Sequence, residues 1–117
     1  MLLIIEEEPD SAQILLSTAH DHNFKVVVAT NGEQGVKLAK VFKPSAITLD
    51  IHLPIIDGWS VLDRLKHDSQ TRHIPVYIVS VLEDERRGLQ VGAVSYIQKP
   101  SSRQGLDAAL EKITDLI

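Results

Sequence analysis

Short apolar runs alternate with longer amphipathic stretches along this chain. The runs are rich in Ile and Val, and they cover residues 2–5, 25–29, 46–49, 76–79 and 95–97. Almost every position in them is apolar, which is typical of parallel strands that are buried on both faces of a sheet. The pattern therefore predicts five strands.

The stretches between the strands are predicted to be helices, because apolar residues recur in them three and four positions apart and form one apolar face. The stripes are Ala12, Leu15, Leu16 and Ala19; Gly35, Leu38, Ala39 and Phe42; Gly58, Val61, Leu62 and Leu65; and Leu106, Ala109, Leu110 and Ile113. Residues 83–91 have few apolar positions before Gly92, so we expect the weakest and most mobile helix there.

Several predicted helix starts carry residues that can cap a helix. A capping side chain is followed three residues later by an amide that can reach back to the backbone. The pairs are Asp10 with Gln13, Asn31 with Gln34, and Ser101 with Gln104. Asp57 is interpreted as the cap of the third helix.

Strand and helix alternate five times, so the expected fold class is α/β, a three-layer αβα domain with a mostly parallel sheet. The chain has 117 residues, of which 44% are hydrophobic and 24% charged, a composition typical of one globular domain spanning residues 1–117. In such sheets the functional crevice lies at the carboxyl ends of the strands.

Charge and cysteine content exclude several classes of function. The net charge is −4 and the longest basic run is Arg86-Arg87, so direct nucleic-acid binding is not expected. The absence of cysteine excludes disulfides and thiolate metal sites and favours the cytosol. The apolar start, residues 1–5, runs into an acidic segment, so we expect neither a signal peptide nor membrane insertion.

Charged and hydroxyl side chains follow four of the predicted strands. The first strand ends in residues 6–8, all Glu, the third in Asp50, the fourth in Ser80 and the fifth in Lys99. Carboxylates gathered at one edge repel one another unless a cation neutralises them, and oxygen ligands suit Mg²⁺ or Mn²⁺. A carboxylate beside a divalent ion, a hydroxyl and an ammonium group can accept a phosphoryl group. Asp50 is the candidate nucleophile.

These motifs, in this order, resemble the receiver domain of two-component response regulators over essentially the whole chain. The matching segments are residues 4–10, Leu49 to Gly58, Val79-Ser80, Gly92-Ala93 and Lys99-Pro100. Residues 71–76 and the Gly58-Trp59 pair are most similar to receivers of hybrid sensor histidine kinases. The resemblance implies a flavodoxin-like, doubly wound sheet with strand order 2-1-3-4-5.

The resemblance also implies roles for the metal-binding residues. Asp50 would accept a phosphoryl group from a phosphohistidine on a histidine kinase or phosphotransfer domain. Glu7, Asp50 and the backbone carbonyl of His52 would bind Mg²⁺, and Glu6 would lie beside them and could reach the ion through water. Such a domain is not a classical enzyme, since it catalyses only its own phosphorylation and dephosphorylation.

Three further residues complete the implied switch. Ser80 would hydrogen-bond the phosphoryl oxygens, Lys99 would pair with them, and Tyr96 would turn inward as Ser80 moves. The change would be felt on the surface of the fourth helix, fifth strand and fifth helix, through which receivers can also form homodimers. The chain would act in the cytoplasm, alone or within a larger, membrane-tethered kinase.

The sequence departs from the family at the site. Both Glu6 and Glu7 are longer than the usual acidic pair, of which at least one is Asp, and Mg²⁺ tolerates little deviation from octahedral geometry, so we expect weak metal affinity. Val81 replaces a small residue after Ser80 and is expected to hinder access, slowing phosphoryl transfer and hydrolysis together. Leu82 cannot orient a water molecule, whereas His52 could.

Two alternatives come from other classes of function. The first is a receiver-like interaction module that no longer accepts phosphate. The second, a flavin-binding flavodoxin-like protein, conflicts with the negative charge of residues 6–8, where a flavin phosphate needs amide donors. If the chain is a receiver, we expect an exposed docking patch for the kinase, formed by Ile55, Ile56, Val81 and Leu82.

Overall fold

The computed structural model describes residues 1–51, 53, 55–80 and 95–98, and of Ser80 and residues 95–98 only the backbone. Five parallel strands form one sheet: β1 (Leu2–Ile5), β2 (Val26–Ala29), β3 (Ala46–Leu49), β4 (Val76–Ser80) and β5 (Ser95–Gln98). Their order is β2-β1-β3-β4-β5, as predicted. The boundaries agree with the apolar runs to within one residue.

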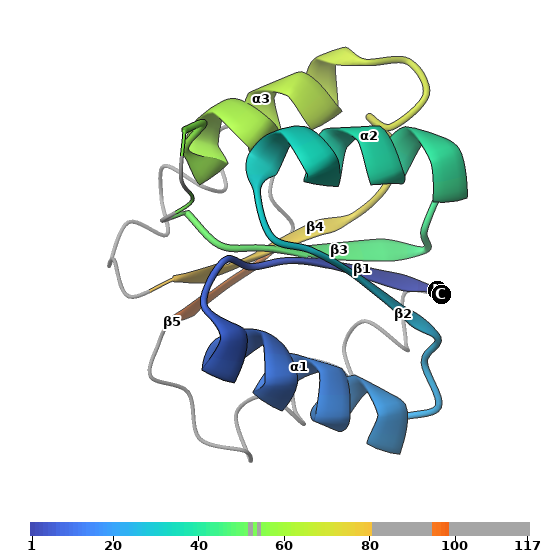
Figure 1. Ribbon diagram of the computed structural model, residues 1–117. Helices are drawn as coiled ribbons and strands as arrows, with labels where there is room; N and C mark the ends of the chain where they lie inside the picture. The colour runs from blue at the N-terminus through green and yellow to red at the C-terminus, as the bar shows by residue number, and fades with distance from the viewer. Residues whose placement is uncertain (52, 54, 81–94, 99–117) are drawn as a thin grey trace.

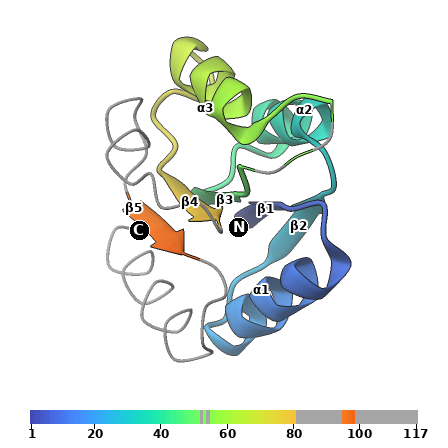
Figure 2. The same cartoon turned by 90° about the vertical axis from the view of Figure 1, so that its left-hand side faces the viewer.

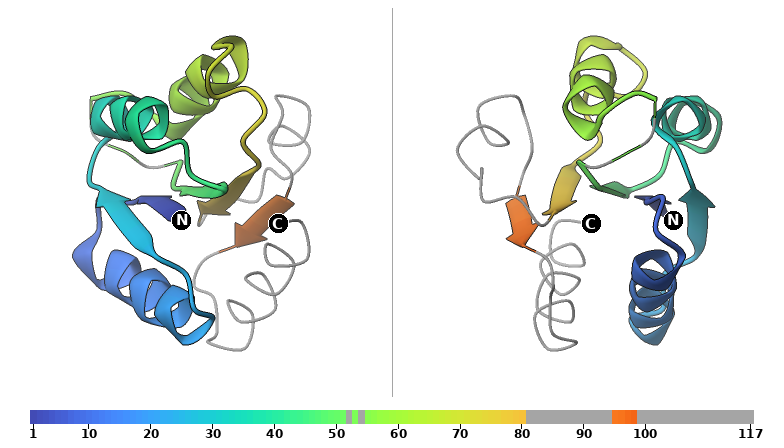
Figure 3. Two further views of the ribbon diagram at one scale, coloured as in Figure 1. Left: turned by 90° about the vertical axis from the view of Figure 1, so that its right-hand side faces the viewer. Right: turned by 60° about the vertical axis from the view of Figure 1, so that its left-hand side comes forward.

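Helices cover both faces of this sheet. α1 (Pro9–Asp21) lies on one face, and α2 (Gly32–Phe42) and α3 (Gly58–His67) lie side by side on the other (Figure 1). The views along the sheet show the same separation into layers (Figures 2 and 3). The predicted α/β class is therefore confirmed, while the helices expected within 83–91 and 101–113 lie outside the described residues.

The continuous apolar runs contribute side chains to two separate hydrophobic cores, one on each face of the sheet. In β1, Leu3 and Ile5 belong to the core beneath α2 and α3, whereas Leu2 and Ile4 belong to the core beneath α1. Successive side chains of a strand point to opposite faces, so a strand covered on both sides needs apolar residues at every position. All four are almost fully buried.

Two of the predicted caps are confirmed. The Asn31 side chain accepts a hydrogen bond from the backbone N–H of Gln34 at 2.8 Å. The Gln34 side chain reaches back one residue further than expected and accepts from the N–H of Thr30 at 3.0 Å. Asp57 caps α3 through the N–H of Ser60 at 2.9 Å.

The expected cap at Asp10 is wrong. The cap is Glu8, whose carboxylate accepts hydrogen bonds from the backbone N–H groups of Asp10 and Ser11 at 3.1 and 2.9 Å. Pro9 causes the shift: its fixed φ and missing N–H suit the first helical position, so α1 begins directly after Glu8. Asp10 therefore lies inside the first turn.

Phe42 also departs from the prediction. It was expected on the buried stripe of α2, but it is 47% exposed. Gly35 packs against Ile5, at the end of β1. Phe42 lies seven residues further along α2, about 10 Å at 1.5 Å per residue, which is roughly the whole length of a four-residue strand. It has therefore reached the edge of the sheet, where little remains to cover it.

Candidate phosphoacceptor site

The backbone places Glu6 and Asp50 side by side at the carboxyl edge of the sheet. The N–H of Asp50 donates to the carbonyl of Ile5 at 3.0 Å, and the N–H of Glu6 donates to the carbonyl of Ala29 at 2.9 Å. Ile5 and Leu49 are register partners, so the next residue of each strand continues the pairing by one step. The predicted convergence of the first and third strand ends is confirmed.

Both of these acidic side chains are buried. Glu6 is 1% exposed and Asp50 is 6% exposed, and both belong to the few buried charged residues in the described part of the chain. Like charges at neighbouring, poorly hydrated positions raise the free energy of the folded state unless positive charge lies nearby. Nearby positive charge, from a basic side chain or from an ion, would stabilise this edge.

The three consecutive glutamates do not act alike. Glu6 is buried, Glu7 is exposed, and both carboxylate oxygens of Glu8 are engaged at the start of α1, where Ser11 Oγ donates to one of them at 2.6 Å. Glu8 is therefore a capping residue, and it is not available to a metal in this arrangement. Among the described residues, no three His, Asp or Glu side chains converge closely enough to form a complete metal-binding cluster.

The loop after Asp50 is held tightly against α3. The carbonyl of Ile51 accepts hydrogen bonds from the N–H groups of Leu53 and Gly58 at 3.1 and 2.8 Å. A Cβ on Gly58 would overlap the carbonyl oxygen of Asp50 and lie 2.5 Å from the Cα of Ile51. Only glycine permits this approach, so the first residue of α3 fixes the backbone that carries Asp50.

Ile55, at the tip of this loop, has an unusual conformation. Its φ is 68°, in the left-handed region, and it is 97% exposed. A β-branched side chain in this region is strained. Ile56 is half-buried and packs against the core, as does Trp59 at the start of α3. The expectation that Ile56 is an exposed member of a docking patch is therefore wrong, because its side chain packs against the core directly before the cap of α3.

The remaining predicted site residues are only partly described. Ser80 ends β4, and Tyr96 lies in β5 opposite Ile78, as their backbones show. The roles predicted for these two side chains remain predictions. His52, Val81, Leu82 and Lys99 lie outside the described residues, as does the predicted switching and dimerisation surface apart from the backbone of β5.

The fold and this strand-end arrangement define an α/β domain with a buried aspartate at the carboxyl edge of its sheet. Comparison with known families identifies it further: the profile of the response regulator receiver domain matches residues 2–111. The chain belongs to this family, which acts in two-component signalling. It is a signalling domain and not a classical enzyme.

Individual relatives agree with this assignment. Protein PilH of Pseudomonas aeruginosa is 32% identical over 108 residues, covering 90% of this chain and 89% of PilH. The DNA-binding dual master transcriptional regulator RpaA of Synechocystis is 33% identical over 102 residues, which cover 85% of this chain and 42% of RpaA. The chain spans about half the length of several of the relatives it matches.

A solved structure agrees with the family assignment. The receiver domain of a sensor histidine kinase from Pseudomonas aeruginosa, with a magnesium ion in its active-site cleft, superposes with a TM-score of 0.85. It is 26% identical, and the match covers 97% of this chain and 96% of that one. In the described part of this chain, no helix is both long and apolar enough to cross a membrane.

Proposed function

We propose that this domain accepts a phosphoryl group on Asp50 from a phosphohistidine. The observation that carries the proposal is the placement of Asp50, buried at the carboxyl end of the central strand β3, on a backbone fixed by Gly58. An Asp50 carboxylate oxygen would attack phosphorus as the bond between phosphorus and the imidazole nitrogen breaks. The imidazole leaves and takes up a proton, and Asp50 becomes an acyl phosphate.

The acidic edge supports Mg²⁺ as the required ion, with Mn²⁺ as a substitute. Mg²⁺ is usually held by one or two carboxylates and keeps several waters, so a complete protein cluster is not needed. Asp50 and Glu7 would supply the carboxylates and the carbonyl of His52 a third oxygen, with buried Glu6 close by. When bound, the ion neutralises charge on the phosphoryl oxygens during transfer.

The other strand ends would complete the switch. Ser80 would donate a hydrogen bond to a phosphoryl oxygen, and Lys99 would pair with the phosphoryl charge. Tyr96 would change its packing as Ser80 moves, altering the surface of the fourth helix, β5 and the fifth helix. Phosphorylation would then bias two packings of that surface toward one, which a partner or a second copy can read.

The phosphodonor would be a histidine kinase or phosphotransfer domain that contacts the loop after β3. Ile55 supports this contact, because it offers an almost fully exposed apolar side chain on the loop that follows Asp50. Val81 and Leu82 would extend the patch at the neighbouring strand end. The similarity to a kinase receiver supports an origin within a hybrid kinase.

The test is the intact mass of the protein after incubation with a small acyl phosphate and Mg²⁺. We expect a single phosphoryl adduct that disappears with a chelator and in Asp50→Asn. The variant Asp57→Asn is the matched control, since Asp57 is exposed, caps α3 and should leave the adduct unchanged. An adduct that persists in Asp50→Asn would refute the assignment.

A second candidate function is a constitutive interaction module. It is favoured by the capping role of Glu8, because both carboxylate oxygens of this strand-end glutamate are engaged at the start of α1. A module of this kind would form no adduct and would show no Mg²⁺-dependent change in Trp59 fluorescence. Metal binding without an adduct would instead point to obstruction by Val81 or to a strict need for the kinase.

A further inference from the structure

A cleft lies between the C-terminal halves of α2 and α3, away from Asp50. Its volume is about 500 Å³, and it is lined by Val36, Lys40, Arg64, His67, Asp68 and Ser69. The N-terminus of α3 contacts the backbone of Asp50, and Arg64 lies six residues further along, about 9 Å at 1.5 Å per residue. The cleft is thus separate from the phosphoacceptor site.

Two basic side chains, Lys40 and Arg64, line this cleft. Within the described residues, every Lys and Arg except Lys25 lies on α2, on α3, or on the segment following one of them. These residues are Lys37, Lys40, Lys43, Arg64, Lys66 and Arg72. The chain as a whole is acidic, with a net charge of −4, so the basic residues of these two helices and of the segments after them contrast with the rest of the chain.

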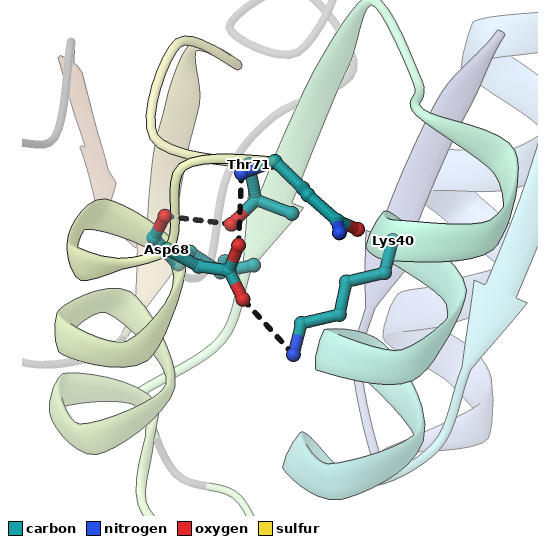
Figure 4. A network of polar contacts seen from close by, with 5 residues as sticks. Lys40, Asp68 and Thr71 are labelled. Carbon is teal, nitrogen blue, oxygen red and sulfur yellow. Dashed lines mark hydrogen bonds and ion pairs between the residues drawn. The ribbon is translucent and has the colours of Figure 1, made fainter.

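Asp68 organises one wall of the cleft. Its carboxylate pairs with Lys40 Nζ at 2.9 Å and accepts a hydrogen bond from the N–H of Gln70 at 2.8 Å. The segment is anchored further by Thr71, whose N–H donates to the carbonyl of Asp68 and whose hydroxyl donates to the carbonyl of Leu65 (Figure 4). Lys40 is therefore held in place across the two helices.

Arg64 is the cation that remains available for binding. Its guanidinium group is exposed and has no ion-pair partner within the described part of the chain, whereas Lys40 is paired with Asp68 and His67 lies 3.1 Å from Asp63. Guanidinium groups bind carboxylates through two parallel hydrogen bonds. A free Arg beside a prepositioned Lys is suited to a ligand carrying carboxylates.

We propose that this cleft docks an acidic segment of a partner protein. Charge complementarity favours a protein segment over a nucleic acid or an anionic membrane, because Asp63 and Asp68 are interspersed among the cations. These carboxylates would repel a continuous row of phosphates, while a peptide can set its own carboxylates against Arg64 and place backbone N–H groups opposite Asp68. Val36 also lines the cleft and offers an apolar contact for one side chain of the segment.

The experiment measures binding of a fluorescein-labelled peptide of repeated Glu-Leu-Glu-Glu units by anisotropy. The unphosphorylated 117-residue chain is used, without Mg²⁺, so the result does not depend on the chemistry of Asp50. We expect Arg64→Glu to weaken binding about 3- to 10-fold, since it replaces an attractive exposed pair with a repulsive one. Lys25→Glu, which makes the same charge change outside the cleft, should weaken binding less than about 2-fold.

Three outcomes would overturn the proposal. The first is no detectable binding of the peptide at low salt. The second is an equal loss in Arg64→Glu and Lys25→Glu, which would indicate only a general charge effect. The third is tighter binding of a DNA duplex or of phosphatidylserine vesicles than of the peptide, with the same dependence on Arg64, which would make the cleft a polyanion site.

Discussion

Replacing Ile55 by glycine should make the domain more stable and at the same time a poorer substrate for its protein phosphodonor. Ile55 has a φ of 68° and is 97% exposed, so its side chain contributes almost no burial to offset its backbone strain. A strained, exposed, apolar residue on the loop after Asp50, the proposed phosphoacceptor, contributes little to folding. The combination favours a role in contact with a partner.

The magnitudes follow from this conformation. A left-handed conformation costs an L-residue about 1–2 kcal/mol, and glycine relieves that cost. Glycine also loses about 0.5–1 kcal/mol through the greater freedom of its unfolded chain, so a net gain of about 0.5–1 kcal/mol is expected. Burying an Ile side chain in a complex contributes about 1.5–3 kcal/mol, so removing it should slow phosphotransfer about tenfold or more.

Urea unfolding followed by Trp59 fluorescence measures the stability, and phosphotransfer is measured from a protein donor and from a small acyl phosphate. Lys43→Gly is the matched control, because Lys43 is also exposed and left-handed, with a φ of 45°, but ends α2. Both variants should be more stable, and only Ile55→Gly should lose transfer from the protein donor. Unchanged transfer in Ile55→Gly, or a loss of stability, would refute the reasoning.

Four further predictions follow from the site and its supports. Gly58→Ala should destabilise the domain by about 1–3 kcal/mol, because the new methyl group overlaps backbone, and slow Asp50 phosphorylation; urea unfolding and intact mass measure both. Asn31→Ala should cost about 1 kcal/mol in urea unfolding through loss of its cap. Val81→Ala should accelerate both acquisition and hydrolysis of the phosphoryl group, followed by mass against time. The Gln70 N–H, and then Lys40, hold the pKa of Asp68 below its ordinary value of 3.8. The ionised Asp68 therefore stabilises the fold above pH 3.8, and this stabilisation is lost as the pH falls through the pKa of the folded state. The stability difference between the wild-type chain and Asp68→Asn should therefore shrink on acidification, and a difference that grows below pH 3.8 would contradict this assignment.

The strands and their convergence could be predicted because the signals are local. A run such as residues 2–5 must supply apolar side chains to both faces of the sheet. Its continuous apolar character therefore predicts a strand that is covered by helices on both sides. The residue that follows it, Glu6, then lies at the carboxyl edge together with Asp50. Nothing beyond chain order and the geometry of parallel strands is needed for that step.

Other features could not be predicted, because the sequence offers more than one residue for the same role. Asp10 and Glu8 are both able to cap α1, and the choice falls to Glu8 because Pro9 fixes the first helical residue. The cleft lined by Lys40 and Arg64 was not predicted, for a different reason. Lys40 and Arg64 are 24 positions apart in the sequence, and no local run of basic residues indicates that they lie together. Only the packing of α2 on α3 brings them to the same cleft.

The start of α1 also constrains what Glu7 can do. On one side, the N–H of Glu6 is fixed to the carbonyl of Ala29, and on the other, Glu8 is fixed by its hydrogen bonds to the first turn of the helix. The backbone of Glu7 is therefore held between two anchored neighbours and cannot slide to compensate for its longer side chain. Any approach of its carboxylate to an ion at Asp50 must come from side-chain rotation alone. The expected weakness of Mg²⁺ binding would then depend on the side-chain torsions of Glu7, while the position of Asp50 itself is set independently by β3 and Gly58.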